Sequence, residues 1–171
     1  DDWACFIDHD AMFTTRTWYM QLLAATRAHP DAGLFGVMTN RVGNPQQELR
    51  GVDQQNHDII YHRRVGREVA SGQHAGVIGP DEYLDMDHPG YNWLAGVVLL
   101  TSKRAWSQVV RDGGIGFPEG YFLGLDNHYH REQWRLGNKC YLLTRVYVYH
   151  WFRADGDDHV RNLSAEWRYR P

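Results

Sequence analysis

The chain has 171 residues, of which 43% are hydrophobic, and this is enough material for the core of a single domain. Its formal net charge is −3, and acidic and basic residues are mixed along its length, so it offers no basic surface to nucleic acid. No apolar run approaches the roughly 20 residues that a membrane-spanning helix needs. We therefore expect a protein with no nucleic-acid partner and no membrane span.

The chain contains two cysteines, Cys5 and Cys140, each within a predicted strand. So few thiols argue against a disulfide framework and indicate a reducing compartment. No signal peptide precedes the first predicted strand. These features predict a cytoplasmic protein, either free or peripheral to a membrane.

The first predicted strand, residues 3–7, leads directly to two carboxylates, Asp8 and Asp10. Its apolar sequence, rich in aromatic and β-branched residues, is typical of a buried strand. Residues i and i+2 of an extended chain share a face, so both carboxylates can point to one side. Carboxylates this close repel each other unless a cation lies between them, and Mg²⁺ or Mn²⁺, which prefer oxygen ligands, fit that role. The alternative is a solvated acidic turn that binds no ion.

Predicted helices and strands alternate along the rest of the chain. Thr14 or Thr15 can cap a helix over residues 16–29, which Pro30 ends. Because strands that alternate with helices favour parallel pairing, the pattern predicts an α/β protein with a mostly parallel sheet flanked by helices. Further strands are predicted over residues 33–39, 93–100 and 139–151, helices over 54–72, 102–111 and 126–137, and loops over 40–53, 78–90 and 113–120.

Several stretches occur in an order that is similar to that of one protein family. An apolar strand leads to Ile7-Asp8-His9-Asp10, followed in turn by HPDAGLFG, WLAGVVLLTSKRAW, FPEGYFLGLDNHYHREQWRLGNK and VYVYHWF. This ordered set resembles the GT-A glycosyltransferases, most closely the large family 2 of mostly inverting enzymes, over about residues 2–152. The resemblance implies a GT-A-like, Rossmann-related fold, with a catalytic domain at residues 1–152 and a C-terminal tail at 153–171.

The resemblance also implies roles for individual residues. Asp8-His9-Asp10 matches the motif that binds a divalent metal, Mn²⁺ or Mg²⁺, on the diphosphate of a nucleotide-sugar donor. Asp126 matches the general base, although Leu125 stands where the family commonly has a glutamate. His150 matches a histidine that reaches the metal in some of these enzymes.

Members of that family carry a nucleotide-binding portion before the metal motif, whereas seven residues precede Asp8 in this chain. The resemblance therefore implies that the chain holds the C-terminal two-thirds of the fold. A missing N-terminal segment or a second chain would then complete the donor site. Trp93, Gly96, Glu119 and Trp134 are the candidates for the acceptor side.

The residue types also fit the chemistry of sugar transfer. A metal held by Asp8 and Asp10 can neutralise the charge that develops on a leaving nucleoside diphosphate. A carboxylate such as Asp126 can take the proton of an attacking hydroxyl group. The other interpretation of Asp126 is a helix N-cap, worth about 1 kcal/mol. The predicted function is inverting transfer of a sugar from a nucleotide-diphosphate-sugar to a hydroxyl of a glycan or similar acceptor.

Two other functions stay open. Asp126 and His130 are at positions i and i+4 of a predicted helix, and with His150 they could form the zinc site of a hydrolase. A module that binds carbohydrate or nucleotide sugar without turnover is the second alternative. If another residue serves as the base, Glu119 and Asp87 are the next candidates.

Overall fold

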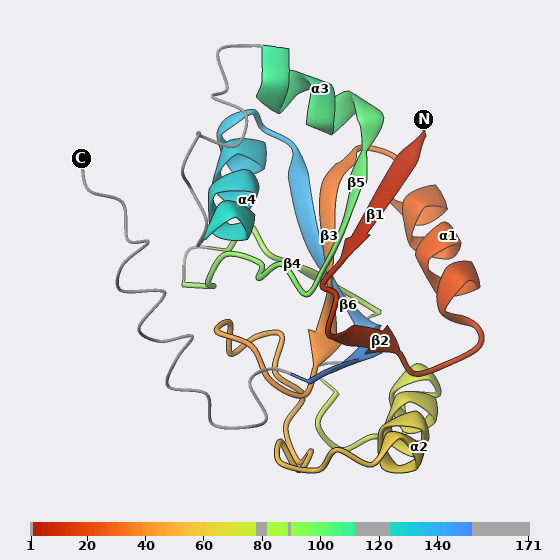
Figure 1. Cartoon of the computed structure of the whole chain (residues 1–171). Helices are drawn as coiled ribbons and strands as arrows, with labels where there is room; N and C mark the ends of the chain where they lie inside the picture. Colours follow the sequence, from red (N-terminus) through yellow and green to blue (C-terminus); the bar gives the residue numbers. More distant parts are fainter. Residues whose placement is uncertain (1, 78–81, 89, 112–123, 152–171) are drawn as a thin grey trace.

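A computed structural model of the chain describes residues 2–77, 82–88, 90–111 and 124–151, which form one mixed sheet with helices packed against it (Figure 1). Glu119 and the predicted tail at residues 153–171 lie outside the described residues. In chain order the elements are β1 (Trp3–Ile7), β2 (Ala11–Phe13), α1 (Trp18–Ala28), β3 (Ala32–Thr39), α2 (Ile59–Ala70), β4 (Tyr83–Asp85), β5 (Val98–Ser102), α3 (Lys103–Arg111), α4 (Leu125–Arg135) and β6 (Lys139–His150).

The sheet is mixed and mostly antiparallel, so the expectation of a mostly parallel, Rossmann-related sheet is wrong. Its strand order is β1-β5-β3-β6-β2, and β4 also pairs with β6. Between the described strands, β3 and β6 form the single parallel pair, and the other four pairs are antiparallel. The α/β composition is as predicted, but the strand directions are not.

The direction of β5 accounts for much of this difference. A parallel neighbour needs a crossover that returns the chain to the start of the previous strand. Here β5 begins beside the carboxyl end of β1, with Val98 opposite Ile7, so β5 runs against both β1 and β3. β2 and β4 add two short antiparallel strands near the end and the start of β6. Neither of these three-residue strands was expected from the sequence.

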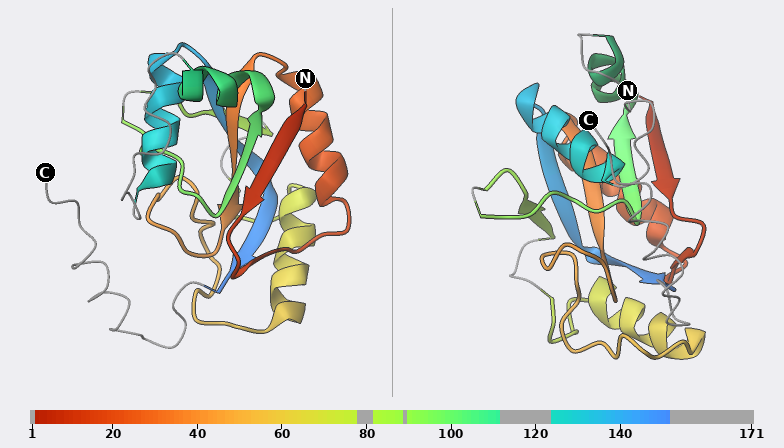
Figure 2. Two further views of the ribbon diagram at one scale, coloured as in Figure 1. Left: turned by 45° about the horizontal axis from the view of Figure 1, so that its top comes forward. Right: turned by 60° about the vertical axis from the view of Figure 1, so that its left-hand side comes forward.

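Both faces of the sheet are covered, which explains why every residue of β3 is buried. Leu34 and Met38 point to one face, and Phe35 and Val37 to the other, as alternation along a strand requires. Figures 1 and 2 show α1 and α4 on opposite sides of the strands. The first face packs against Val65 and Val69 of α2, Val109 of α3 and Tyr129 of α4, and the second against Leu22 and Ala25 of α1.

The helix ends agree with the sequence in part. Ser102 caps α3 as expected, because its Oγ accepts a hydrogen bond from the backbone N–H of Ala105 at 3.1 Å. Gly137 ends α4 in a left-handed conformation with φ of 76°. The cap expected from Thr14 or Thr15 is wrong, since the N-cap residue of α1 is Thr17, which makes no side-chain cap hydrogen bond. The hydroxyl of Thr14 donates instead to the carbonyl of Tyr147 in β6 at 2.7 Å.

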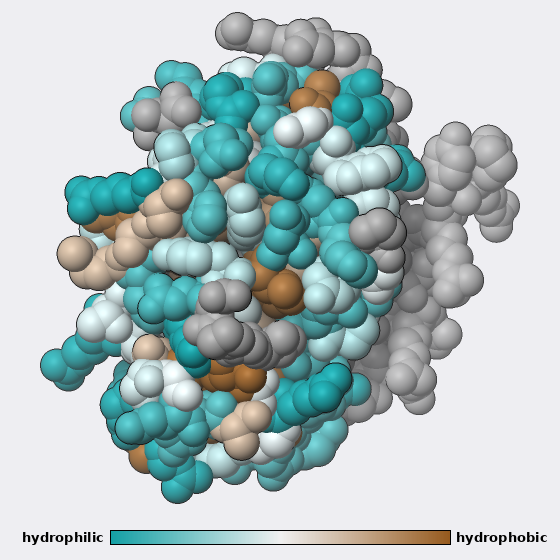
Figure 3. All heavy atoms as spheres, turned by 180° about the vertical axis from the view of Figure 1, so that it is seen from behind, coloured by the Kyte–Doolittle hydropathy of each residue, from teal (hydrophilic) through white to brown (hydrophobic). Residues whose placement is uncertain are grey.

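β1 is an edge strand of the described sheet, and it is more exposed than its apolar sequence predicts. The side chains of Phe6 and Ile7 are 47% and 42% exposed. The face of the molecule seen in Figure 3 is, in contrast, mostly hydrophilic. Within the described residues no helix combines the length and the apolar composition needed to cross a membrane.

Candidate functional site

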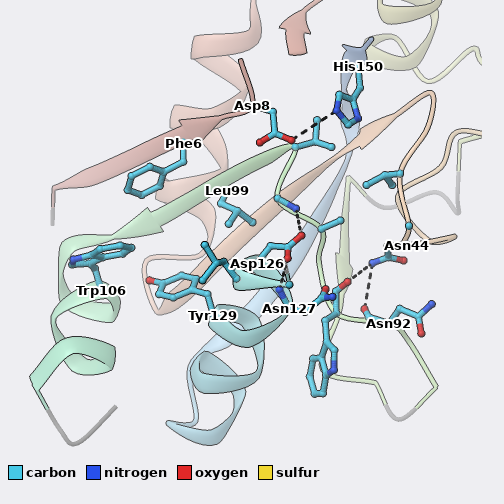
Figure 4. A pocket seen from close by; sticks show the side chains of 18 residues that line it. Phe6, Asp8, Asn44, Asn92, Leu99, Trp106, Asp126, Asn127, Tyr129 and His150 are labelled. Carbon is cyan, nitrogen blue, oxygen red and sulfur yellow. Dashed lines mark hydrogen bonds and ion pairs between the residues drawn. The ribbon is translucent and has the colours of Figure 1, made fainter. Parts of the chain in front are cut away.

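A pocket of about 710 Å³ lies where β1 ends, between the segment that leads into β5 and the start of α4 (Figure 4). Asp8 and His150 lie at one margin, and Asp126 lies near its middle. The lining differs between the two ends. Phe6, Leu99, Trp106 and Tyr129 form an aromatic end, and Asn44, Asn92 and Asn127 form an amide end.

The turn between β1 and β2 fixes the backbone of the two predicted metal carboxylates. The N–H of Asp8 donates to the carbonyl of Val97 at 3.0 Å, just before β5. The carbonyl of Asp10 accepts from the N–H of Trp151 at 2.9 Å, just after β6. Both aspartates are therefore placed by strands that are far apart in the sequence.

His150 ends β6 beside these carboxylates. Its Nε2 lies 3.4 Å from Asp10 Oδ1 and 3.8 Å from Asp8 Oδ2. Its Nδ1 lies 2.9 Å from the carbonyl oxygen of Arg41, and a carbonyl can only accept, so Nδ1 carries the proton. When the ring is neutral, its lone pair is on Nε2, which faces the two aspartates. This is the tautomer that a metal-ligating histidine needs.

The backbone of His150 is held by the side chain of Asn40. The N–H of His150 donates to Asn40 Oδ1 at 2.7 Å, and Asn40 Nδ2 donates to the carbonyl of His150 at 3.0 Å. Asn40 is buried and follows β3 directly. The side-chain amide of Asn40 therefore continues the hydrogen bonding between β3 and β6, and it holds the backbone of His150 beside the aspartates.

The ligand atoms of Asp8, Asp10 and His150 all lie within 4.8 Å of one another, so one ion could contact all three. Burial is the largest of the effects that raise the pKa of Asp8, and the charges of Asp10 and Asp126 add to it, while His150 opposes them. A divalent cation would offset this clustering of negative charge. The two carboxylates suit Mn²⁺ or Mg²⁺, and the imidazole, a ligand typical of transition metals, favours Mn²⁺ of the two. His9, between the aspartates, is exposed and does not belong to this group.

Asp126 lies in the first turn of α4, and the N-cap position belongs to Gly124. Asp126 Oδ2 accepts from the backbone N–H of Gly96 at 2.7 Å, and Oδ1 accepts from the N–H of Asn127 at 2.9 Å. A Cβ at position 96 would lie 3.1 Å from Asp126 Cβ, so any larger residue there would push Asp126 away by a few tenths of an ångström. Each carboxylate oxygen keeps a second lone pair that can accept a proton.

Residues 92–96, which we call the pocket wall, have no regular structure and are held by side chains from elsewhere. Gln47 pairs with Ala95 as a strand would, accepting its N–H at 2.6 Å and donating to its carbonyl at 3.3 Å. Asn44 Nδ2 donates to the carbonyls of Asn92 and Trp93 at 3.3 and 2.9 Å. The loop after β3 therefore fixes the wall that Asp126 contacts.

Asn40, Asn44 and Gln47 were not singled out from the sequence, where residues 40–53 are predicted as a loop. The available signal is the density of amide side chains directly after a buried strand. Such side chains can replace backbone partners in irregular segments. Gln47 is fully buried, which is unusual for a loop glutamine and reflects this role.

The structure divides the acceptor-side candidates. Trp93 and Gly96 line the pocket. Trp134 is 54% exposed on α4, with its ring centroid 6.3 Å from that of Trp93, and it does not line the pocket. Asp87, the reserve candidate for the base, lies outside the pocket lining as well.

The zinc site predicted from Asp126, His130 and His150 is not assembled in the described residues. His130 is fully buried, and its Nδ1 accepts from the backbone N–H of Leu94 at 2.7 Å. It groups with Asp87 and Cys140, whereas His150 groups with Asp8 and Asp10. The two histidines therefore belong to separate clusters.

Comparison with known proteins identifies no relative. No family model, no curated protein and no solved structure matches the chain. The chemistry of the pocket therefore has to be inferred from its own residues and from the order of the motifs in the sequence.

Proposed function

We propose that the chain is a metal-dependent glycosyltransferase that moves a sugar from a nucleotide-diphosphate-sugar to a hydroxyl of a glycan or similar acceptor. The observation that carries this proposal is the position of Asp126 in the same pocket as Asp8 and His150, with Asp10 completing the ligand group. A metal group and a separate carboxylate in one pocket are the two parts that such a reaction requires. The ordered resemblance in the sequence supports the same reaction, although its implied sheet is wrong.

Asp8, Asp10 and His150 are the residues that would hold Mn²⁺ or Mg²⁺. When bound, the ion would act as a Lewis acid on the donor diphosphate and neutralise the charge of the leaving group. The protein prepares this site by fixing the His150 tautomer through Arg41 and by anchoring Asp8 to Val97. These contacts hold the ligands without any contribution from the substrate.

Asp126 is the proposed general base. A sugar hydroxyl is too weak an acid to attack unaided, and a positioned carboxylate that takes its proton contributes about 10²–10⁴-fold to the rate. The hydrogen bonds from Gly96 and Asn127 fix the orientation of the carboxylate. Direct attack assisted by one carboxylate, with no covalent intermediate, inverts the configuration at the transferred sugar carbon.

The pocket lining suits a sugar substrate. Amide side chains at one end offer donors and acceptors to hydroxyl groups. Trp93 is also in the lining, and an aromatic ring can pack against an apolar sugar face. The exposed apolar edge of β1, next to Asp8, supports the further proposal that another strand pairs there and completes the donor site. That strand would come from a second chain or from a segment outside residues 1–171.

One observation favours a second candidate, a module that binds nucleotide sugar without transfer. Both oxygens of Asp126 already accept backbone N–H groups, which is also the arrangement of a purely structural aspartate. Binding of the donor with no transfer would then be expected. The zinc hydrolase is not supported, because Asp126, His130 and His150 do not form one group in the described residues.

The test is an assay of the chain with Mn²⁺ and a panel of nucleotide-diphosphate-sugars, with and without saccharide acceptors. Calorimetry measures donor binding, and release of nucleoside diphosphate measures turnover. Metal-dependent donor binding, acceptor-stimulated release and loss of donor binding in His150→Ala are the expected results. Binding without acceptor-stimulated release would favour the non-catalytic module, and absence of any metal-dependent binding would refute both.

A further inference from the structure

A second cluster of ligand-type side chains lies outside the pocket. Asp87 follows β4, His130 is in the middle of α4 and Cys140 is near the start of β6, and their ligand-type atoms all lie within 4.8 Å of one another. Two buried atoms of these side chains, Asp87 Oδ1 and His130 Nε2, have no hydrogen-bond partner. The other oxygen of Asp87 is paired, with Lys139 Nζ at 3.4 Å. Buried polar atoms without partners are rare and costly, so this pair needs an explanation.

The hydrogen bond between Leu94 and His130 determines which nitrogen carries the proton. The backbone N–H of Leu94 can only donate, so the lone pair of the neutral ring must be on His130 Nδ1. Nε2 therefore carries the proton and is a donor. Burial lowers the pKa of His130 from 6.5 to about 4, so the ring stays neutral near pH 7. The cluster therefore contains an unpartnered donor, His130 Nε2, and an unpartnered acceptor, Asp87 Oδ1.

This tautomer argues against a metal at the cluster, although aspartate, histidine and cysteine are all metal ligands. A metal would need the Nε2 lone pair, which the Leu94 hydrogen bond excludes. Burial also raises the pKa of Cys140 well above its usual value, so the sulfur remains a thiol. His150 has the opposite tautomer because a carbonyl faces its Nδ1. Of these two histidines, His150 therefore has the tautomer that a metal ligand needs, and His130 does not.

We infer that Asp87, His130 and Cys140 hold one buried water molecule, and that through it His130 is a positioning residue for the pocket wall. The water accepts from Nε2–H of His130, donates to Asp87 Oδ1 and makes its third contact with the Cys140 sulfur. Two hydrogen bonds of about 2.8 Å through one water span up to roughly 5.6 Å, more than the separation within the cluster. Buried waters typically make about three such bonds.

The water between Asp87 and His130 affects the pocket because His130 holds the backbone N–H of Leu94 in the pocket wall. Leu94 is fully buried in the pocket wall, two residues before Gly96, whose N–H holds Asp126. With Nε2–H held by the water, the ring cannot exchange tautomers, and Nδ1 remains an acceptor for Leu94. The consequence for sugar transfer rests on the proposed function, whereas the water and the tautomer do not.

The water and the tautomer are tested directly on the full chain. Nitrogen-15 NMR of the histidine rings should show His130 as the neutral Nε2–H tautomer, unchanged by added Zn²⁺, and a crystal structure should show a water in contact with all three side chains. An Nδ1–H tautomer, or a zinc ion bound by Asp87, His130 and Cys140, would overturn the inference. So would a crystal structure with no water in contact with His130 Nε2.

Two substitutions at one position separate the two ring nitrogens. His130→Asn places an oxygen near the position of Nδ1 and keeps an acceptor for Leu94, whereas His130→Gln extends toward Nε2 and loses that acceptor. Hydrogen exchange of the Leu94 amide should rise about tenfold or more in His130→Gln, the factor expected for one lost hydrogen bond, and less in His130→Asn. The amides of β3 serve as an internal reference for global stability. Equal exchange of Leu94 in both variants would contradict the positioning role.

Asp85 offers a control for the carboxylate of Asp87. Both pair with Lys139 at 3.4 Å, but Asp85 is exposed and outside the cluster. Asp85 Oδ1 also accepts the backbone N–H of Asp87 at 2.9 Å, and an asparagine at position 85 keeps this acceptor. Asp87→Ala should admit the second tautomer of His130 and raise Leu94 exchange several-fold, whereas Asp85→Asn should do neither. If Leu94 exchange rose equally in both variants, the loss of the ion pair with Lys139 would explain it. The inferred water between Asp87 and His130 would then be refuted. In the transfer assay, Asp87→Ala should lower kcat more than it raises the donor KM, because Asp126 and not the metal group is displaced.

Discussion

The Nδ1–H of His150 donates to the carbonyl oxygen of Arg41 at 2.9 Å, and this single contact turns the Nε2 lone pair toward Asp8 and Asp10. Arg41 belongs to the loop after β3, and the neighbouring Asn40 holds the backbone of the same histidine. The loop therefore sets both the position and the tautomer of a residue that lies 109 positions away in the sequence. Metal binding should depend on these contacts as well as on the ligands themselves.

The first prediction concerns Asp10, whose carboxylate lies closest to His150 Nε2. Asp10→Asn removes one negative ligand, and Mn²⁺ affinity measured by calorimetry should fall by about tenfold or more while the fold is retained. Asp2→Asn is the control, because Asp2 is an exposed carboxylate at the start of β1 that pairs with Lys103. Unchanged Mn²⁺ binding in Asp10→Asn would exclude this carboxylate from the metal site.

The second prediction concerns Gly96. A methyl group added there would lie 3.1 Å from Asp126 Cβ and 3.4 Å from its Oδ2, so the carboxylate must shift by a few tenths of an ångström. Transfer by Gly96→Ala should fall by about tenfold or more, because small displacements of a catalytic group are costly. Gly43→Ala, whose new methyl group meets nothing within 4 Å, is the control for the effect of the substitution on stability. Transfer at the parent rate in Gly96→Ala would show that the position of Asp126 is not critical.

The longer helices and strands could be predicted because each has a pattern in its own segment of the sequence. The apolar runs gave β3 and β6, and the glycine at 137 marked the end of α4. The direction of β5 could not be predicted, since it depends on which end of the sheet the chain reaches after α2 and β4. β2 and β4, with three residues each, are too short to show a periodicity.

The candidate site also contains some residues that the sequence predicts and others that it does not. The sequence motifs predict that Asp8, Asp10 and His150 lie together, and the structure brings them together. The amides of Asn40, Asn44 and Gln47 could not have been selected, because their partners are backbone groups of segments 48 to 110 residues away. Sequence patterns identify residues that carry chemistry, whereas the residues that position them are defined only by the folded backbone.

The third prediction is a pH dependence of stability that originates at His130. Its pKa is lowered by burial from 6.5 in the unfolded chain to about 4 in the folded chain, so the unfolded state binds its proton first as the pH falls. The neutral, buried ring of His130 therefore contributes to the free energy of unfolding above about pH 6.5. This contribution, about 3 kcal/mol in total, is lost progressively as the pH falls toward about 4. Burial also lowers the pKa of His62, which acts in the same direction. Burial raises the pKa of Asp87 above its usual value of 3.8, and this acts in the opposite direction as the pH falls toward about 3.8.

Urea unfolding of the parent chain and of His130→Asn, from about pH 7 to about pH 4.5, measures this contribution. The free energy of unfolding of the parent should decrease over this range, and the decrease should be clearly smaller in His130→Asn. His88→Ala is the control, because His88 is exposed on the loop after β4. Parallel curves for the parent and His130→Asn would show that His130 is not the titrating group.

The last prediction concerns Asp126. Both of its oxygens accept backbone N–H groups, from Gly96 and Asn127, and an asparagine can present an acceptor to only one of them. Asp126→Asn should therefore lose about 1 kcal/mol of stability as well as about 10²–10⁴-fold in transfer rate, with donor binding retained. The two effects have to be separated.

Gly96→Ala separates the positioning effect from the loss of the base. It disturbs the contact between Gly96 and Asp126 but keeps the carboxylate. If Asp126 only positions the wall, the two variants should lose similar activity, whereas a base predicts a much larger loss in Asp126→Asn. Added formate or acetate should partly restore transfer in Asp126→Ala, because a small carboxylate can enter the space and accept the proton, which a structural defect would not allow. Transfer by Asp126→Asn at the parent rate would place the base elsewhere. Since Asp87 lies outside the pocket lining, Glu119 would then be the residue to substitute next.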